Sequence, residues 1–165
     1  MSRIDVSPGE SPQDLERMKS RMPPPLPCLI AVLAGVGLDH WLPWSIGPRP
    51  FTLVAGAAAL LAMAVLGTAT FRAFQRHATP LDPSYETVAI IETGPFRYSR
   101  NPAYIGFILL QAAIACFLDN AWILVFIIPA VVAIQQLVVL REEAYLAAKF
   151  GDVYLRYKAR VRRWI

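Results

Sequence analysis

The sequence predicts an all-α integral membrane protein with four transmembrane helices and a cytoplasmic C-terminal amphipathic helix. Of its 165 residues, 56% are hydrophobic, and the mean hydropathy of +0.43 is higher than in an ordinary soluble domain. A hydrocarbon core about 30 Å thick requires about 20 apolar residues in a helix. Four stretches approach this length: residues 26–44, 51–71, 102–118 and 121–140.

Three polar or helix-breaking features refine these stretches. Asp39 and His40 interrupt the first stretch near its far end. Because a charge at the bilayer centre costs roughly 2.5–3.5 kcal/mol, we place both residues at the interface. Pro129 is expected to kink the fourth helix near its middle. The Asp119-Asn120 turn is so short that the third and fourth helices should form an antiparallel hairpin.

The basic residues predict the orientation in the membrane. Fifteen of the 16 Lys and Arg residues fall in the N-terminal tail, the loop before residue 102 and the C-terminal tail, whereas the first loop has only Arg49. Basic loops face the cytoplasm. We therefore expect a cytoplasmic tail (1–25), one domain (26–165) with both termini cytoplasmic, and the inner membrane of a prokaryotic cell. Anionic membrane lipids account for the net charge of +4, so nucleic acid is not an expected partner.

Two polar segments adjoin the apolar stretches on this cytoplasmic side. The first, residues 94–104, reads GPFRYSRNPAY and leads into a helix that should begin at Pro102, with Asn101 as N-cap. Helix amides next to Arg97 and Arg100 suit a carboxylate or phosphate. Alternatively, the arginines anchor the helix at the lipid headgroups.

The second polar segment, residues 141–164, is expected to continue the fourth helix out of the membrane. Its adjacent carboxylates, Glu142 and Glu143, need a positive partner, either a cationic ligand or one of the arginines of the first polar segment. Four apolar or aromatic residues then recur at helical spacing: Phe150, Tyr154, Tyr157 and Val161. We interpret this stripe as packing or interfacial anchoring in preference to a binding site.

Common soluble catalytic motifs are missing from the sequence. It contains no G-x-G-x-x-G, P-loop, H-E-x-x-H, C-x-x-C or G-x-S-x-G pattern, and we predict no metal site. His77 stands alone beside Arg76, so we interpret it as a solvated or interfacial side chain in preference to a catalytic base. No catalytic residue is assigned.

Together, the two polar segments resemble the C-terminal signature of the membrane methyltransferase superfamily, which includes isoprenylcysteine carboxyl methyltransferases and phospholipid methyltransferases. The usual pattern is G-P-[FY]-x-x-x-R-[HN]-P-x-Y-x-G followed by E-E-x-x-L-x-x-x-F-G-x-x-Y-x-x-Y. The resemblance covers residues 72–161. The matching residues are Gly94, Pro95, Phe96, Arg100, Asn101, Pro102, Tyr104, Gly106, Glu142, Glu143, Leu146, Phe150, Gly151, Tyr154 and Tyr157.

The resemblance implies an enzyme that uses S-adenosylmethionine and methylates a lipophilic or amphiphilic acceptor at the cytoplasmic interface. This methyl donor carries an ammonium, a sulfonium, a carboxylate and an adenine, so its site needs an acid, a positive or helix-terminal donor, and an apolar wall. The residues that the resemblance assigns to cofactor binding are Val88, Ala89, Ile90, Ile91, Phe96, Arg100, Asn101, Tyr104, Glu142 and Glu143.

The chain departs from the superfamily pattern at two positions. Many members have His where this chain has Asn101, which keeps hydrogen bonding and loses the imidazole. The isoprenylcysteine branch has an arginine one helical turn before the first Glu, where this chain has Val138. This difference argues against a prenylcysteine carboxylate as the substrate.

Two other classes of function stay open on the sequence alone. One is a non-enzymatic membrane protein for interaction or transport. The other is an NADPH-dependent membrane reductase, since some sterol reductases share a similar C-terminal region. A preference for S-adenosylmethionine over NADPH in ligand binding distinguishes the methyltransferase from both.

Overall fold

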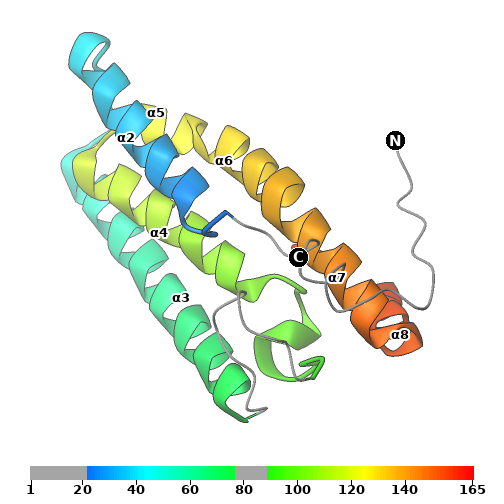
Figure 1. Cartoon of the computed structure of the whole chain (residues 1–165). Helices are drawn as coiled ribbons and strands as arrows, with labels where there is room; N and C mark the ends of the chain where they lie inside the picture. Colours follow the sequence, from blue (N-terminus) through cyan, green and yellow to red (C-terminus); the bar gives the residue numbers. More distant parts are fainter. Residues whose placement is uncertain (1–21, 77–88) are drawn as a thin grey trace. The chain divides into compact units, whose positions relative to one another are not determined.

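The computed structural model describes residues 22–76 and 89–165, and the regular structure within these ranges is entirely helical. The helices are α2 (Leu26–Trp41), α3 (Arg49–Arg76), the 3-10 turn η1 (Gly94–Arg97), α4 (Pro102–Leu118), α5 (Ala121–Val125), α6 (Ile127–Ile134), the π-helical turn η2 (Gln135–Val139), α7 (Leu140–Phe150) and α8 (Asp152–Arg160). Figure 1 shows their course along the chain.

These residues form two compact units, each assembled from separate parts of the sequence. Residues 23–68 and 102–134 form the first, here called the apolar unit. Residues 69–76, 89–101 and 135–165 form the second, here called the motif unit because it holds most of both polar segments. The single domain predicted over residues 26–165 stays a prediction.

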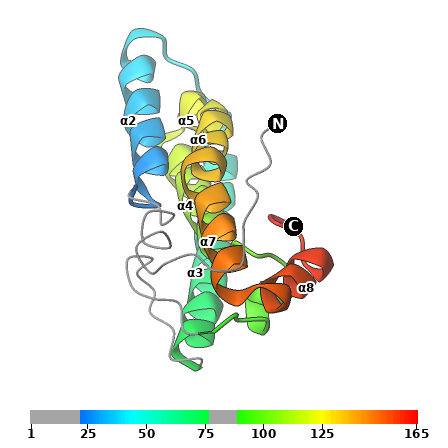
Figure 2. The same ribbon diagram turned by 45° about the vertical axis from the view of Figure 1, so that its right-hand side comes forward.

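Small residues allow close helix packing in the apolar unit, where α2, α4, α5 and α6 lie side by side (Figures 1 and 2). A Cβ atom added to Gly35 on α2 would lie 2.6 Å from the Ile123 side chain on α5. A Cβ atom added to Gly56 on α3 would lie 3.0 Å from the Phe117 ring on α4. Such contacts are typical of helix pairs in membranes, where close packing replaces the hydrophobic drive.

The predicted hairpin between the third and fourth stretches is confirmed, because α4 and α5 pack together across the Asp119-Asn120 turn. Asn120 caps α5 by accepting the Ile123 N–H at 3.1 Å, and its amide donates to the Gly35 carbonyl at 3.2 Å. The Asp119 carboxylate accepts the Ser45 hydroxyl at 2.8 Å and the Ile46 N–H at 3.0 Å. These bonds fasten the hairpin tip to the connection between α2 and α3.

The boundaries of the predicted helices are partly confirmed. Helix α4 covers the predicted residues 102–118, whereas α2 ends at Trp41 and α3 extends from Arg49 to Arg76. The disruption expected from Pro129 appears as a break at Phe126, between α5 and α6. Proline has no N–H to donate to the carbonyl four residues earlier, and its ring clashes there, which explains the position of the break.

The predicted continuation of the fourth helix into the second polar segment is confirmed as far as Phe150 and is wrong beyond it. Helix α7 ends at Phe150, and Gly151 has a φ of +51°, a left-handed conformation that glycine adopts without strain. A second helix, α8, begins at Asp152 and runs in another direction (Figure 2). The turn at Gly151 brings the C-terminal residues back toward the first polar segment.

Among residues 22–76 and 89–165, two helices are long and apolar enough to cross a membrane. They are α3, with 28 residues, and the 30-residue helical stretch Ala121–Phe150, whereas α2 and α4 are shorter apolar helices. Large apolar side chains point outward along the apolar unit: Leu33, Val54, Leu61 and Ile128 are each more than 60% exposed. Soluble monomers rarely expose apolar surface on this scale, so these faces suit contact with lipid.

Candidate functional site

The first polar segment folds as a tight turn within the motif unit. Gly94 has a φ of +62°, and Pro95 follows it at the start of η1. The Pro95 carbonyl accepts the N–H groups of Tyr98 and Ser99, both at 3.1 Å. The Ser99 hydroxyl then accepts the Asn101 N–H at 3.1 Å. This local network orders the backbone immediately ahead of α4.

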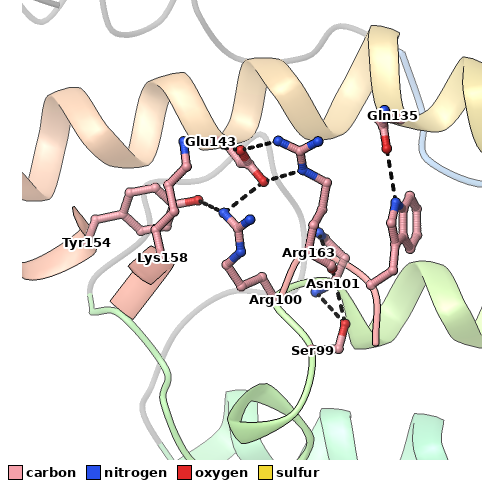
Figure 3. A network of polar contacts seen from close by, with 9 residues as sticks. Ser99, Arg100, Asn101, Gln135, Glu143, Tyr154, Lys158 and Arg163 are labelled. Carbon is pink, nitrogen blue, oxygen red and sulfur yellow. Dashed lines mark hydrogen bonds and ion pairs between the residues drawn. The ribbon is translucent and has the colours of Figure 1, made fainter. Parts of the chain in front are cut away.

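Glu143 on α7 is the centre of a buried ionic network (Figure 3). Its side chain is only 7% exposed. Oε1 accepts Arg163 Nε at 2.8 Å and Arg100 Nη1 at 2.9 Å, and Oε2 accepts Arg163 Nη2 at 2.9 Å and lies 3.5 Å from Lys158 Nζ. A carboxylate can be buried at this depth only when it is paired and hydrogen-bonded, as it is here.

Two tyrosines of α8 complete the wall of this network. Tyr154, 2% exposed, accepts Arg100 Nη1 at 3.4 Å, and Tyr157 donates its hydroxyl to the Phe96 carbonyl at 2.8 Å. Burial, and then the nearby Glu143 charge, raises the pKa of Tyr154 to about 12. Burial likewise raises the pKa of Tyr157. Both phenols therefore keep their protons at neutral pH, and the packing interpretation is confirmed for these two members of the stripe.

The C-terminal residues return to the first polar segment along their backbone. The Arg163 carbonyl accepts Asn101 Nδ2 at 2.9 Å and the Ser99 hydroxyl at 3.3 Å, and the Arg162 carbonyl accepts the Arg100 N–H at 3.0 Å. The Trp164 indole donates to Gln135 Oε1 at 3.0 Å (Figure 3). Hydrogen bonding to Glu143 raises the pKa of Arg163, which keeps its charge in this setting.

The structure brings together three of the residues predicted from the sequence, namely Arg100, Asn101 and Glu143. Of the two arginines considered as partners of the acidic pair, Arg100 binds Glu143 and Arg97 is exposed. The other predicted residues are distributed as follows: Ile91 is buried, Ala89, Ile90, Phe96 and Glu142 are half-buried in the motif unit, Tyr104 is buried on α4 of the apolar unit, and Val88 lies outside the described residues, as does His77.

Four participants of the network were missed at the sequence level: Gln135, Lys158, Arg163 and Trp164. Arg163 is 20 residues from Glu143 and 62 from Asn101 in the chain. An acidic pair next to a basic C-terminal tail was a signal that one of these basic residues would serve as its partner, but the sequence does not show which.

Comparison with known proteins identifies the family. The phospholipid methyltransferase family matches this chain over residues 51–153, more than half of its length. The chain belongs to that family. An uncharacterised protein of Haemophilus influenzae is 40% identical over 62 residues, which cover 38% of this chain and 98% of that protein. No solved structure matches the chain significantly.

Membership in the phospholipid methyltransferase family bears on the site directly. The matched region includes Arg100, Asn101, Glu142 and Glu143, and it ends at residue 153, before Tyr154. Membership supports a membrane-associated methyltransferase that acts on lipid-like substrates. The resemblance inferred from the two polar segments is confirmed at the level of the superfamily.

Proposed function

We propose that this protein is an S-adenosylmethionine-dependent membrane methyltransferase that modifies a lipophilic or amphiphilic acceptor at the cytoplasmic interface. The observation that carries the proposal is the union of the two polar segments in one unit, where Arg100 of the first binds Glu143 of the second at 2.9 Å. When bound, S-adenosylmethionine supplies an electrophilic methyl group on a positively charged sulfur. The protein has to hold that group in line with the acceptor.

The network separates the roles of the two adjacent acids. Both oxygens of Glu143 are already engaged by Arg100, Arg163 and Lys158, so this residue has no capacity left for a cationic ligand. We assign the cationic end of the methyl donor to Glu142, the first acid of the signature, which is half-buried at the preceding position of α7. Glu143 acts by fixing the surrounding residues.

The remaining residues of the proposed cofactor site supply polar contacts and an apolar wall. Ile91 is 6% exposed, and the Phe96 ring meets the Phe74 ring edge to face at 5.5 Å between centroids. We add Val88, Ala89 and Ile90 to this wall because they precede Ile91 in the chain. Asn101, the last residue of the turn, is proposed to contribute polar contacts to the carboxylate of the methyl donor, and the role predicted for Tyr104, which belongs to the apolar unit, stays a prediction.

We assign no catalytic base. Tyr154 and Tyr157 are buried and keep their protons at neutral pH. Positioning of the reactants can supply about 7–11 kcal/mol of an in-line transfer, so an acceptor that is already nucleophilic needs little proton transfer. The contribution of this chain is then orientation and exclusion of water.

A lipid acceptor is favoured over a prenylcysteine carboxylate. Val138, at the position where the isoprenylcysteine branch has an arginine, is fully buried in the π-helical turn η2. An apolar side chain at this depth cannot bind a carboxylate. An acceptor anchored in the leaflet is already concentrated and oriented there, so few dedicated polar contacts are needed.

The decisive experiment measures ligand binding to the detergent-solubilised protein. A ligand at about 100 times its dissociation constant should stabilise the protein by roughly 2.7 kcal/mol, so a thermal shift with S-adenosylmethionine, and none with NADPH, is expected. Glu142→Gln should weaken S-adenosylmethionine binding by about 1.5–3 kcal/mol, the usual value of a charged hydrogen bond. Stabilisation by NADPH, or unchanged S-adenosylmethionine affinity in folded Glu142→Gln, would contradict the assignment.

We further propose four membrane spans with both termini in the cytoplasm, formed within one domain of residues 26–165. Helices α2 and α4 have 16 and 17 residues, and a helix of this size is about 24–26 Å long, a little less than the hydrocarbon core. Reporter fusions at the C-terminus and at the Asp119-Asn120 tip should therefore lie on opposite sides of the membrane. The same side for both reporters would rule out this topology.

A further inference from the structure

Arg163, near the end of the chain, lies beyond both the signature and the region matched to the family. We infer that Arg163 is a positioning residue for methyl-donor binding, because it joins Glu143 to the turn of residues 99–101 and thereby sets the direction of Glu142. This inference rests on the proposed function and deepens it. Its evidence comes from two independent sets of contacts, one from the side chain and one from the backbone.

The side chain of Arg163 binds Glu143 through two parallel hydrogen bonds. Nε donates to Oε1 at 2.8 Å and Nη2 donates to Oε2 at 2.9 Å. A guanidinium that binds a carboxylate in this way fixes the plane of the carboxylate as well as its position. Lys158, by comparison, lies 3.5 Å away, and its side chain is 41% exposed, so it offers charge without this geometry.

The backbone of Arg163 binds the first polar segment. Its carbonyl accepts both Asn101 Nδ2, at 2.9 Å, and the Ser99 hydroxyl, at 3.3 Å. The neighbouring residues hold this C-terminal segment in place, since the Arg162 carbonyl accepts the Arg100 N–H and the Trp164 indole donates to Gln135. One residue therefore contacts both halves of the signature at once (Figure 3).

The consequence for ligand binding follows from helix geometry. Successive residues of an α-helix are about 100° apart around its axis, so clamping Glu143 fixes the rotation of α7 and the direction of Glu142. The backbone carbonyl of Arg163 likewise holds Asn101, the residue immediately before α4, in place. Arg163 thus controls the placement of the acid and of the polar turn that we assign to the methyl donor.

Loss of the Arg163 side chain should leave the motif unit folded. Glu143 would keep its ion pair with Arg100 at 2.9 Å, so no unpaired charge would remain buried. The backbone contacts of residue 163 do not depend on its side chain. Arg162 provides a matched control, because it is an exposed arginine at the adjacent position that contacts the turn through its backbone carbonyl.

The test uses the full-length protein in detergent or nanodiscs, with radiolabelled S-adenosylmethionine as the probe. We expect Arg163→Gln to raise the dissociation constant about tenfold or more, because loss of the two charge-assisted bonds to Glu143 leaves Glu142 less well positioned, whereas Arg162→Gln stays within about twofold of wild type. Arg163→Lys should give an intermediate dissociation constant, because a lysine ammonium does not bind both oxygens of the Glu143 carboxylate in parallel. Combining Arg163→Gln with Glu143→Gln should add little to the effect of Glu143→Gln alone.

Thermal unfolding of each variant separates positioning from stability, since the dissociation constant is measured well below the unfolding temperature. Wild-type affinity in folded Arg163→Gln would overturn this inference and leave the proposed function standing. Tighter binding would also overturn it, because the tail would then be an obstacle to the ligand. If Arg163→Gln does not fold, Arg163→Lys decides by the same criterion. No binding by the wild-type chain would overturn the proposed function and this inference together.

Discussion

The apolar unit and the motif unit bury polar groups in different ways. The buried polar residues of the apolar unit are Thr52, Gln111 and Asn120, and each bonds to backbone atoms of its own unit. The motif unit buries the charged side chain of Glu143 among two arginines and a lysine. Close packing therefore stabilises the first unit, whereas ion pairing organises the second.

This difference indicates which sequence changes each unit should tolerate. Packing of small and apolar residues tolerates many sequences of similar volume and patterning. A buried carboxylate is different, because removal of either partner leaves an uncompensated charge. The motif unit should thus be sensitive to single charge changes and the apolar unit to changes of volume, and each expectation can be tested.

The largest effect is expected from Glu143→Ala in the motif unit. This change removes the partner of Arg100, whose side chain is only 10% exposed, and breaking a buried pair typically costs about 3–5 kcal/mol. Chemical unfolding monitored by tryptophan fluorescence would measure the loss. A change below about 1 kcal/mol would show that water reaches the network and that the comparison between the units is wrong.

In the apolar unit, Gly35→Ala should destabilise by about 1–3 kcal/mol through overpacking. The new Cβ atom would lie 2.6 Å from Ile123 Cγ1 and 2.9 Å from the Ile123 backbone nitrogen, so the helices must move apart. Gly37→Ala is the matched control on the same helix, because nothing lies within 4 Å of its Cβ position. Equal stability of the two variants would mean that close packing of α2 against α5 does not matter.

Sequence analysis predicted the apolar unit better than it predicted the motif unit. Hydropathy predicted the position of α4 and the hairpin after it because burial in lipid depends on local composition. The left-handed turn at Gly151 was not predicted. The role of Arg163 was not predicted either, because folding selects the ion-pair partner, which lies 20 residues from Glu143 in the chain. The signature located Arg100, Asn101 and Glu143 without revealing that Glu143 is saturated by protein contacts.

The smallest effect is expected at the hairpin tip, where the half-buried Asp119 contrasts with the buried Glu143. Hydrogen bonds from the Ser45 hydroxyl and from the backbone, together with Arg49, hold the pKa of Asp119 below its ordinary value of 3.8. A depressed pKa in the folded state means that the stabilisation is present above this value and is lost as the pH falls below it. The unfolding temperature of wild type should therefore fall more steeply below about pH 4 than that of Asp119→Ala. Parallel pH profiles would show that solvent already screens the Asp119 contacts, and that Asn120 and the other hydrogen bonds of the tip order it without them.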